Sequence, residues 1–555
     1  MRYFVSAFLC IAAAFGVLAN PSYAAATATA KPGLVVVVVV DQLSSELFDR
    51  LAPLFTGGFK TFRDRGVQFS NAQHDHAFTQ TAPGHFVIMS GLHPGRGGII
   101  ANEFYDRTKR KIVYAVDDPD ARVFGSDERG VSYRDVDATA LGDWMKSADA
   151  RSMVYSVAGK DRAAILLGGK HPDCAFWFDN DVGGFTTSTY YRDTVPALAV
   201  QFNAKESARQ YFGKKWEHSL KDDRLYQTYA GVDDAAGENA FAGEDSPVFP
   251  HALIGPPDVS ERDAFGRFRG FPWLDEMTLD FAEHILISAG LGADDHPDLL
   301  CVSLSAFDII GHTFGPNSRE AMDAAVCIDR KLAEFQRDVE KRVGRKRVVF
   351  VLSSDHGILP LVERLRAAGK DSARVNDQVK AFREKVLNEL EKKYGQAESF
   401  FMFRGQENMY FDHDALARRK IPPADVYQFV RQLAVSESWI AEVVDRDQLL
   451  SGAPVDPIVE RTRHSFHPAK GADIYLIPKP YYLTSGAQAR GGTNHGTPYT
   501  YDSHVPMIFL LPDAGPAVIS RPVRTVDLAP TLSRLLGVTP PSDVDGSALP
   551  EIISR

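Results

Sequence analysis

The side chains best suited to chemistry in this sequence are carboxylates and imidazoles near the ends of apolar runs. Asp308 and His312 are four residues apart, so one helical turn would place both on one face, within reach of one ion. Asp355 and His356 precede a glycine, where a sharp turn lets adjacent side chains contact one metal. His495 lies in a glycine-rich loop, where backbone approaches a ligand closely. Taken singly, these patterns have ordinary alternatives: a surface pair, an aspartate cap beside a core histidine, and a structural or exposed loop histidine.

Together with Asp41, these residues form a set that is hard to attribute to chance. The set offers six oxygen or nitrogen ligands and contains no cysteine. That number and type of ligand suit two zinc-like ions rather than one. A two-metal site clamps both the attacking and the leaving oxygen of a displacement at phosphorus. The set therefore points to metal-dependent phosphoryl transfer.

A nucleophile for such a site is offered by the segment 79–89. Pro83 suits the first turn of a helix, which places Thr81 near its N-terminus. Backbone N–H groups and the helix dipole favour a phosphate there, and metal coordination makes the threonine alkoxide accessible. The alternatives are that Thr81 only caps the helix, or that Thr79 is the nucleophile. Three nearby histidines are expected to have supporting or structural roles: His74, His76 and His85.

The elements that must position these residues are three short apolar runs. The runs 34–40, 299–304 and 347–352 are rich in β-branched residues and end at polar ones, which is typical of parallel strands covered on both faces. Between the last two, residues 318–343 have the apolar spacing of an amphipathic helix. This alternation predicts an α/β fold with a doubly wound, mostly parallel sheet sandwiched by helices. Ligands bind beyond the carboxyl ends of such strands, and three aspartates lie just past these ends: Asp41, Asp308 and Asp355.

Two long intervals interrupt the alternation of strands and helices. We expect residues 31–555 to form one catalytic domain with insertions at about 105–270, which carries Lys160 and Arg162, and at about 358–488. Both insertions would lie above the sheet as a cap over the site. Separate linked domains are the alternative, but no linker rich in proline, glycine and serine divides the chain.

The N-terminus has the pattern of a signal peptide. A basic start at Arg2 is followed by an apolar stretch from Phe4 to Leu18 and a small-residue site, which predicts cleavage near Ala24 and a signal peptide over residues 1–24. A membrane anchor is the alternative, although the apolar stretch is short. We expect the mature protein to be periplasmic or secreted, without a membrane anchor.

Composition narrows the function classes further. The chain has 555 residues, of which 44% are hydrophobic and 24% charged, and this is ordinary globular composition. A net charge of −10 gives no general basic field, so we expect no nucleic-acid partner.

Three cysteines remain after the signal peptide, namely Cys174, Cys301 and Cys327. At most one bridge can form among three thiols; Cys301 with Cys327 is one option, and buried inert thiols are the other.

These motifs, in this order, resemble the alkaline phosphatase superfamily, and specifically the bacterial, monomeric, phosphate-irrepressible alkaline phosphatases that use a threonine. The resemblance covers essentially the whole mature chain, which makes it far more specific than any single motif. The matching segments are Val40–Gln42, Thr81–His85, Ala101–Asp106, Gly159–Ala163, Phe307–Pro316, Ser354–Gly357, Asn494–Gly496 and Val526–Leu532.

The resemblance implies a monomeric enzyme that hydrolyses small-molecule phosphate monoesters and holds two zinc ions per chain. Thr81 would attack phosphorus in line and form a phosphothreonine intermediate, while Asn102, Lys160 and Arg162 would contact phosphoryl oxygens. One zinc ion would take the leaving oxygen and then bind the water that hydrolyses the intermediate. The implied ligands are Asp308, His312 and His495 for that ion, and Asp41, Asp355, His356 and Thr81 for the other.

The pair Lys160 and Arg162 decides the subclass. They are two apart, which places them on one side of an extended segment. A monoester dianion carries more charge on its terminal oxygens than a diester does, so two cations there favour the monoester. A salt-bridged turn between strands is the alternative for this pair.

Two rival functions remain to be separated. A phosphodiesterase or nucleotide pyrophosphatase of the same superfamily resembles this chain at Thr81 and Asn102, so those residues do not discriminate. A catalytically silent binding protein with this fold would have lost a ligand or the nucleophile, and none is missing. A sulfatase is disfavoured because it needs cysteine or serine at the position of Thr81.

Overall fold

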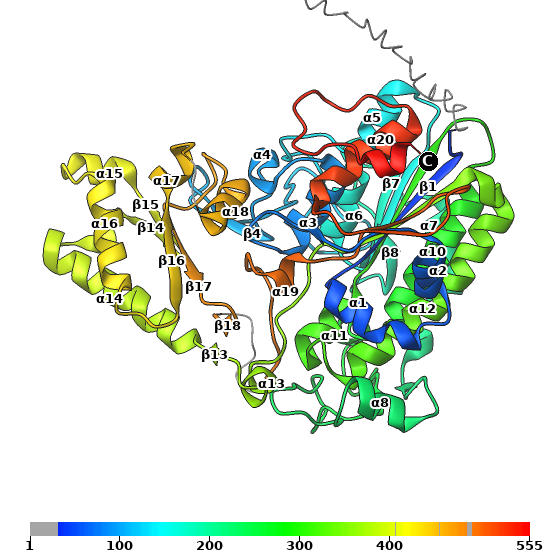
Figure 1. The fold of residues 1–555 in the computed structure, drawn as a ribbon, viewed down its shortest axis with the longest axis horizontal. Coiled ribbons are helices and arrows are strands. Elements are labelled where there is room, and N and C mark those ends of the chain that lie inside the picture. Colours follow the sequence, from blue (N-terminus) through cyan, green and yellow to red (C-terminus); the bar gives the residue numbers. More distant parts are fainter. Residues whose placement is uncertain (1–30, 406, 454–455, 485–490, 555) are drawn as a thin grey trace, which may run out of the picture.

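The structure, a computed structural model, describes residues 31–405, 407–453, 456–484 and 491–554 and centres on a nine-stranded sheet (Figure 1). The strand order is β20-β2-β19-β12-β1-β11-β6-β7-β8, and the five strands from β12 to β7 are mutually parallel. Antiparallel pairings join β19 and β8 to that parallel block. The strands are β1 (Leu34–Val40), β2 (Val67–Phe69), β6 (Val154–Ala158), β7 (Cys174–Asp179), β8 (Gly184–Thr186), β11 (Asp298–Leu304), β12 (Val348–Ser353), β19 (Ile508–Leu510) and β20 (Ala517–Ile519).

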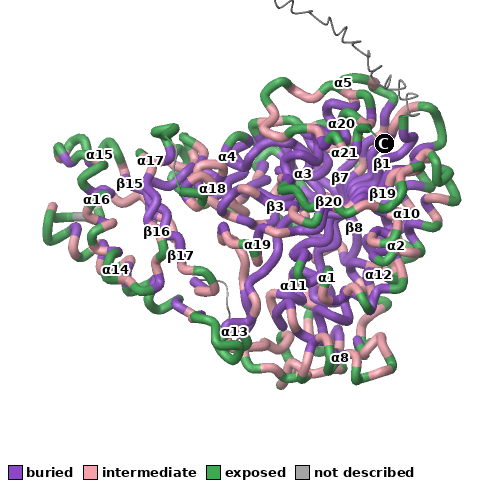
Figure 2. The backbone as a smooth tube through the Cα atoms, viewed as in Figure 1, coloured by how far each residue is buried: buried purple, intermediate pink, exposed green. Residues whose placement is uncertain are grey.

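Helices cover both faces of this sheet, which explains the valine run of β1. All seven residues of β1 are buried, and their side chains alternate between two separate hydrophobic cores. Figure 2 shows the sheet as the most continuously buried part of the chain. One core includes side chains of α2 (Gly58–Arg65), α10 (Pro272–Ala289) and α12 (Arg319–Val339), and the other includes those of α3 (Thr81–Ser90), α5 (Leu141–Ala148) and α20 (Leu528–Leu536).

The predicted strands and the predicted helix between them are confirmed. The three apolar runs form β1, β11 and β12, which lie side by side in parallel. The amphipathic segment forms α12, whose first turn is capped by the Ser318 hydroxyl accepting from the Ala321 N–H. The predicted α/β, doubly wound sheet is therefore present, with antiparallel strands added near its edges.

The prediction that residues 105–270 form an insertion above the sheet is wrong for part of that interval. Strands β6, β7 and β8 belong to the central sheet, where β6 pairs with β11. Polar residues such as Ser156 interrupt the apolar pattern from which strands are predicted. The buried hydroxyl of Ser156 donates to the Ala164 carbonyl at 2.7 Å, so the serine is tolerated inside the sheet. The hairpin of β4 (Glu103–Asp106) and β5 (Lys111–Tyr114) lies outside that sheet.

A second lobe, defined here as the described residues between 373 and 483, lies beside the core and is coloured yellow-green to orange in Figure 1. Its antiparallel sheet has the order β14-β15-β17-β16 and packs against α14 (Asn376–Tyr394), through the buried Val379 and Phe382, and against α16 (Pro423–Ala434). The lobe lies within the predicted insertion at 358–488. Its strands are β14 (Phe401–Arg404), β15 (Asn408–Phe411), β16 (Ile440–Asp445) and β17 (Ile474–Pro478).

The described residues test the expectation about the cysteines. Cys174, Cys301 and Cys327 are all free thiols, so no bridge joins Cys301 to Cys327. Burial raises the pKa of the Cys174 thiol to about 12, which makes it unreactive. None of the helices described is both long and apolar enough to cross a membrane. The predicted signal peptide over residues 1–24 lies outside the described residues.

Candidate active site

Three buried aspartates gather at one edge of the central sheet. Asp41 follows β1, Asp355 follows β12, and Asp308 lies in the first turn of α11 (Ala306–Phe314) after β11. Because the three strands are adjacent and parallel, their carboxyl ends meet and bring the carboxylates together.

The first cluster consists of Asp308, His312 and His495, whose ligand atoms lie within 4.8 Å of one another. The Asp308 Oδ1 is 3.3 Å from Nε2 of His312 and 3.7 Å from Nε2 of His495. The Nδ1 of His312 is held by the Thr493 carbonyl at 2.9 Å, and that of His495 by the Thr79 carbonyl at 2.7 Å. These contacts fix both rings with Nε2 facing the carboxylate, which is the usual arrangement of metal-binding histidines.

The second cluster consists of Asp41, Asp355 and His356. Nε2 of His356 is 3.5 Å from Asp41 Oδ1 and 3.3 Å from Asp355 Oδ2, while its Nδ1 is held by the Gly357 carbonyl. Among the described residues, Asp41 Oδ1, Asp355 Oδ2 and His356 Nε2 are buried without a hydrogen-bond partner. Buried polar atoms left unpartnered are costly, so three that converge are well explained by a cation site. Asp308 also lies within reach of Asp41 and His356, which joins the two clusters.

Lys160 lies between the two clusters. Its Nζ is 2.6 Å from Asp41 Oδ2, 2.6 Å from Asp308 Oδ2 and 3.4 Å from the Thr81 hydroxyl. The ammonium group therefore bridges a carboxylate of each cluster. An extended segment was predicted to carry Lys160 and Arg162; instead, Lys160 precedes α6 (Asp161–Gly168) and Arg162 lies in its first turn. Asp161 explains the helix start, since an acidic residue is favourable in a first turn.

Thr81 is the first residue of α3, and it does not cap that helix. The cap position is Gln80, whose side chain makes no capping hydrogen bond. The Thr81 Oγ1 is instead 3.4 Å from both Lys160 Nζ and Arg162 Nη2. The rival hydroxyl of Thr79 donates to the Thr497 carbonyl at 3.0 Å.

Gly84 lets α3 begin close to the aspartates. A Cβ added at Gly84 would lie 2.2 Å from the main-chain oxygen of Asp355, so no larger residue fits without moving the backbone. The N-terminal turn of α3 is thereby held against the end of β12. This contact sets the first turn of α3, which begins at Thr81, against Asp355 of the second cluster.

Asn102 and Arg162 line the same cleft as Thr81. The Asn102 Oδ1 accepts from the Ala82 N–H at 2.8 Å, which orients the side chain at the start of α3. The Arg162 Nη1 is 3.2 Å from the hydroxyl of Tyr114, and that hydroxyl donates to Asp161 Oδ1 at 2.5 Å. Tyr114 was not predicted as a site residue, and nothing in the short strand that it ends distinguishes it in the sequence.

The cleft has a volume of about 710 Å³ and lies between the core and the second lobe. The core contributes the candidate site residues Thr81, Asn102, Arg162 and Asp308. The lobe contributes aromatic and apolar side chains of β15 and β17 and the residues after them: Tyr410, Tyr475, Ile477, Pro478 and Tyr482. One wall of the cleft is therefore formed by residues that the second lobe places there.

Comparison with known proteins decides the family. The model of the family described as type I phosphodiesterase / nucleotide pyrophosphatase matches residues 35–431. The chain belongs to this family. It is 32% identical to alkaline phosphatase PafA of Elizabethkingia meningoseptica over 534 aligned residues. This alignment covers 95% of this chain and 96% of PafA. It is also 32% identical over 544 residues to alkaline phosphatase PhoK of Sphingomonas sp, covering 94% of this chain and 91% of that one.

A solved structure of this family has the same fold. The crystal structure of wild-type alkaline phosphatase PafA aligns with a TM-score of 0.87 at 30% identity and covers 94% of this chain and 99% of that one. The likeness therefore includes the second lobe as well as the central sheet. The resemblance to alkaline phosphatases drawn from the motifs is confirmed at the level of family and fold.

Burial shifts the pKa values of the candidate ligand groups. Burial, with the neighbouring His356 and His312, holds the pKa of His495 well below its usual value, so its imidazole is neutral. Burial likewise lowers the pKa of His356. Neutral imidazoles are the form that coordinates metal ions. Burial and the nearby Asp355 raise the pKa of Asp41, a shift that Lys160 partly opposes and that any added cation would also oppose.

Gln42 belongs to a matching segment, but the sequence analysis assigned it no role in the site. Its backbone has a φ of 75°, which turns the chain sharply after Asp41. Its side-chain amide donates to Asp308 Oδ1 at 2.7 Å, and its main-chain N–H donates to Asp355 Oδ1 at 3.1 Å. One residue thus orients a carboxylate in each cluster. A Cβ at position 311 would lie 1.7 Å from Gln42 Oε1. Only a glycine at this position therefore leaves space for the Gln42 side chain.

Of the three histidines expected to have supporting or structural roles, His74 and His85 make such contacts. His76 does not: both its ring nitrogens are buried without a hydrogen-bond partner among the described residues, and its ring packs edge-on against that of His74. The His85 Nδ1 is 2.8 Å from the Thr81 carbonyl and 3.2 Å from Asp355 Oδ2, and its Nε2 is 2.8 Å from the Ser303 hydroxyl. The His74 Nε2 is 3.0 Å from the Ser354 carbonyl. Both rings therefore brace the ends of strands that carry candidate ligands.

Proposed function

We propose that this protein is an alkaline phosphatase that hydrolyses small-molecule phosphate monoesters at the cleft around Thr81. The observation that carries the proposal is the position of the Thr81 hydroxyl. It lies at the first residue of a helix, 3.4 Å from two cationic side chains, Lys160 and Arg162. It also lines the same cleft as Asp308, His312 and His495, and the Lys160 ammonium beside it bridges Asp41 and Asp308.

The ligand set fits two zinc ions. Imidazole nitrogens and carboxylate oxygens without thiolates are typical of catalytic zinc, and each cluster supplies three protein ligands. We propose that Asp308, His312 and His495 bind one ion. The second ion would be bound by Asp41, Asp355 and His356 together with Thr81. When bound, such ions supply Lewis-acid stabilisation of the oxygens that become negative at the reacting phosphorus.

The protein's own residues account for the remaining steps. The Thr81 Oγ1 forms a bond to phosphorus as the bond to the leaving oxygen breaks, which gives a phosphothreonine that water then hydrolyses. The positive end of the α3 dipole favours the phosphoryl group there. Asn102, Lys160 and Arg162 contact its non-bridging oxygens and stabilise their charge more strongly as the transition state forms.

The rival within this family is a phosphodiesterase, and the two activities are separable. Phosphate monoester and diester substrates with the same p-nitrophenyl leaving group would be compared on protein of measured metal content. Because two cations adjoin the nucleophile, we expect kcat/KM for the monoester to exceed that for the diester by roughly tenfold or more. A diester rate equal to or above the monoester rate would assign the diesterase activity instead.

Metal removal tests the more distant rival, a catalytically silent binding protein. Stripping with EDTA should lower monoester kcat by roughly tenfold or more, since the ions stabilise both reacting oxygens, and added zinc should restore it. Metal content and activity would be measured on the same samples. Near-zero zinc in the purified protein, with no activity sensitive to EDTA, would favour the silent binding protein.

We further propose that the protein is exported to the periplasm or beyond the cell and acts as a monomer. Export is supported by the signal-peptide pattern of residues 1–24. The monomeric state is supported by the resemblance to monomeric alkaline phosphatases stated from the motifs.

A further inference from the structure

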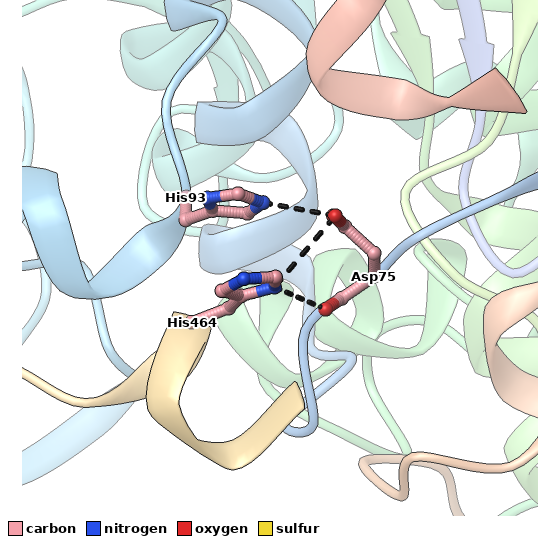
Figure 3. Close-up of side chains that lie close together, drawn as sticks. All are labelled: Asp75, His93 and His464. Carbon is pink, nitrogen blue, oxygen red and sulfur yellow. Dashed lines mark hydrogen bonds and ion pairs between the residues drawn. The ribbon is translucent and has the colours of Figure 1, made fainter. Parts of the chain in front are cut away.

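A separate group of metal-ligating side chains lies outside the candidate active site (Figure 3). Asp75 follows β3 (Ala72–Gln73), His93 precedes α4 (Pro94–Gly97), and His464 is on α18 (Pro457–Ser465). Each offers one ligand atom within 4.8 Å of the others. Two of these residues belong to the core and the third to the second lobe, so the group spans the contact between them.

Each imidazole of the group faces Asp75 with one nitrogen and another carboxylate with the other. The His93 Nε2 is 3.0 Å from Asp75 Oδ2, and its Nδ1 is 3.1 Å from Asp545 Oδ2. The His464 Nδ1 is 3.6 Å from Asp75 Oδ2 and 2.7 Å from the Asp75 carbonyl, and its Nε2 is 3.5 Å from Glu460 Oε1. With no ion bound, the His464 Nδ1 donates its proton to that carbonyl, and the tautomer protonated at Nε2, which faces Glu460, would free Nδ1 for an ion. Outer carboxylates that orient a histidine toward an ion in this way are the usual second layer of metal sites.

The two rings point the same way. They are stacked with centroids 3.7 Å apart and an interplanar angle of 13°. Figure 3 shows both rings approaching Asp75 from one side. The side chains are 18% exposed for Asp75, 8% for His93 and 23% for His464, so solvent ions can reach a mostly shielded place. Asp75 Oδ1 is buried without a hydrogen-bond partner among the described residues.

Carboxylates and arginines both border the group. Burial alone would lower the pKa of His93, but its hydrogen bonds to Asp545 and Asp75 raise it to about 9. Two arginines also face these carboxylates: Arg524 is 3.7 Å from Asp75 Oδ2 and Arg96 is 3.0 Å from Asp545 Oδ1.

We propose that Asp75, His93 and His464 form an additional metal site that binds zinc or a similar borderline divalent ion and fastens α18 to the core. Two imidazole nitrogens and one carboxylate oxygen are a ligand set for such ions, with a position left for water. The bound ion would stabilise the structure and take no part in catalysis. Its position at α18 means that it would hold the second lobe, and with it one wall of the cleft, against the core.

Zinc stoichiometry tests the site directly. Full-length wild type, His464→Gln and His93→Gln would be stripped with a chelator, saturated with zinc, desalted and analysed for bound metal. The matched control is His467→Gln, which changes a nearby histidine outside the group. We expect both trio variants to bind about one zinc fewer than wild type, with monoester kcat kept within about threefold, and the control to match wild type. Equal zinc content in all four proteins would overturn the proposal.

A second measurement needs no variant and so does not depend on the folding of one. Crystals of the wild-type protein grown with excess zinc would be measured on both sides of the zinc absorption edge. An anomalous peak between His93 Nε2, His464 Nδ1 and Asp75 Oδ2 is expected. Anomalous peaks at the cluster around Asp308 with none at Asp75 would show that the group is only a protonated histidine held by carboxylates, and would overturn the proposal.

Discussion

Replacing Thr81 with alanine is expected to lower kcat/KM for a phosphate monoester by roughly 10⁴-fold or more. The change removes the atom that would bond to phosphorus, so the covalent route is lost as a whole. The side chain lies at the first residue of α3 and makes no capping hydrogen bond for that helix, so the fold should remain intact. Activity would be measured with p-nitrophenyl phosphate, and the thermal unfolding midpoint would report on the fold.

Two further variants make the Thr81 result specific. Thr81→Ser keeps a hydroxyl at the same position and should retain much of the activity. Thr79→Ala removes the neighbouring hydroxyl, which donates to the Thr497 carbonyl, and should cost far less than Thr81→Ala. If Thr81→Ala kept near wild-type turnover, or if Thr79→Ala lost as much, Thr81 would not be the nucleophile.

Trapping the intermediate gives an independent measurement. A phosphothreonine at Thr81 should be detected by mass spectrometry of a peptic digest after rapid acid quenching of enzyme and substrate. The Thr81→Ala protein should show no phosphorylated peptide. Phosphate found on another residue of the wild type would contradict the assignment even if the alanine variant were inactive.

The site was predictable where its residues follow strong local patterns. Asp41, Asp308 and Asp355 follow apolar runs that only a buried parallel sheet explains, and parallel pairing brings the ends of such strands to one edge. The spacing of Asp308 and His312 needs only one helical turn to place both on one side. His495 had no such local signal, and the motif order of the whole chain pointed to it.

Other parts of the site depend on tertiary contacts that leave little trace in the sequence. β6 is stabilised by pairing with β11, although Ser156 interrupts its apolar pattern, so the extent of the sheet was underestimated. Gln42 contributes through a φ of 75° and a hydrogen bond to a residue 266 positions away. The wall of the cleft formed by the second lobe likewise arises from packing between distant segments.

Removing both cations near the nucleophile should separate the two ester classes. The double variant Lys160→Ala/Arg162→Ala is expected to lower monoester kcat/KM by roughly 10²- to 10⁴-fold, because each charged hydrogen bond contributes about 1.5–3 kcal/mol. The diester rate should fall much less, because a diester places an alkyl or aryl group where one of these contacts would be. Rates on both ester classes with one leaving group measure the difference.

The contacts of Lys160 require a control on metal content. Its Nζ bridges Asp41 and Asp308, so its loss also changes the charge balance of both clusters, whereas Arg162 contacts neither carboxylate at hydrogen-bond distance among the described residues. Bound zinc would therefore be measured for each single variant. Tyr114→Phe is the matched control for Arg162→Ala. It removes the Tyr114 hydroxyl, which accepts a hydrogen bond from Arg162, and changes no charge. If Arg162→Ala lowered monoester and diester rates equally at unchanged zinc content, the guanidinium would serve the structure of the cleft, and the preference for monoesters would need another source.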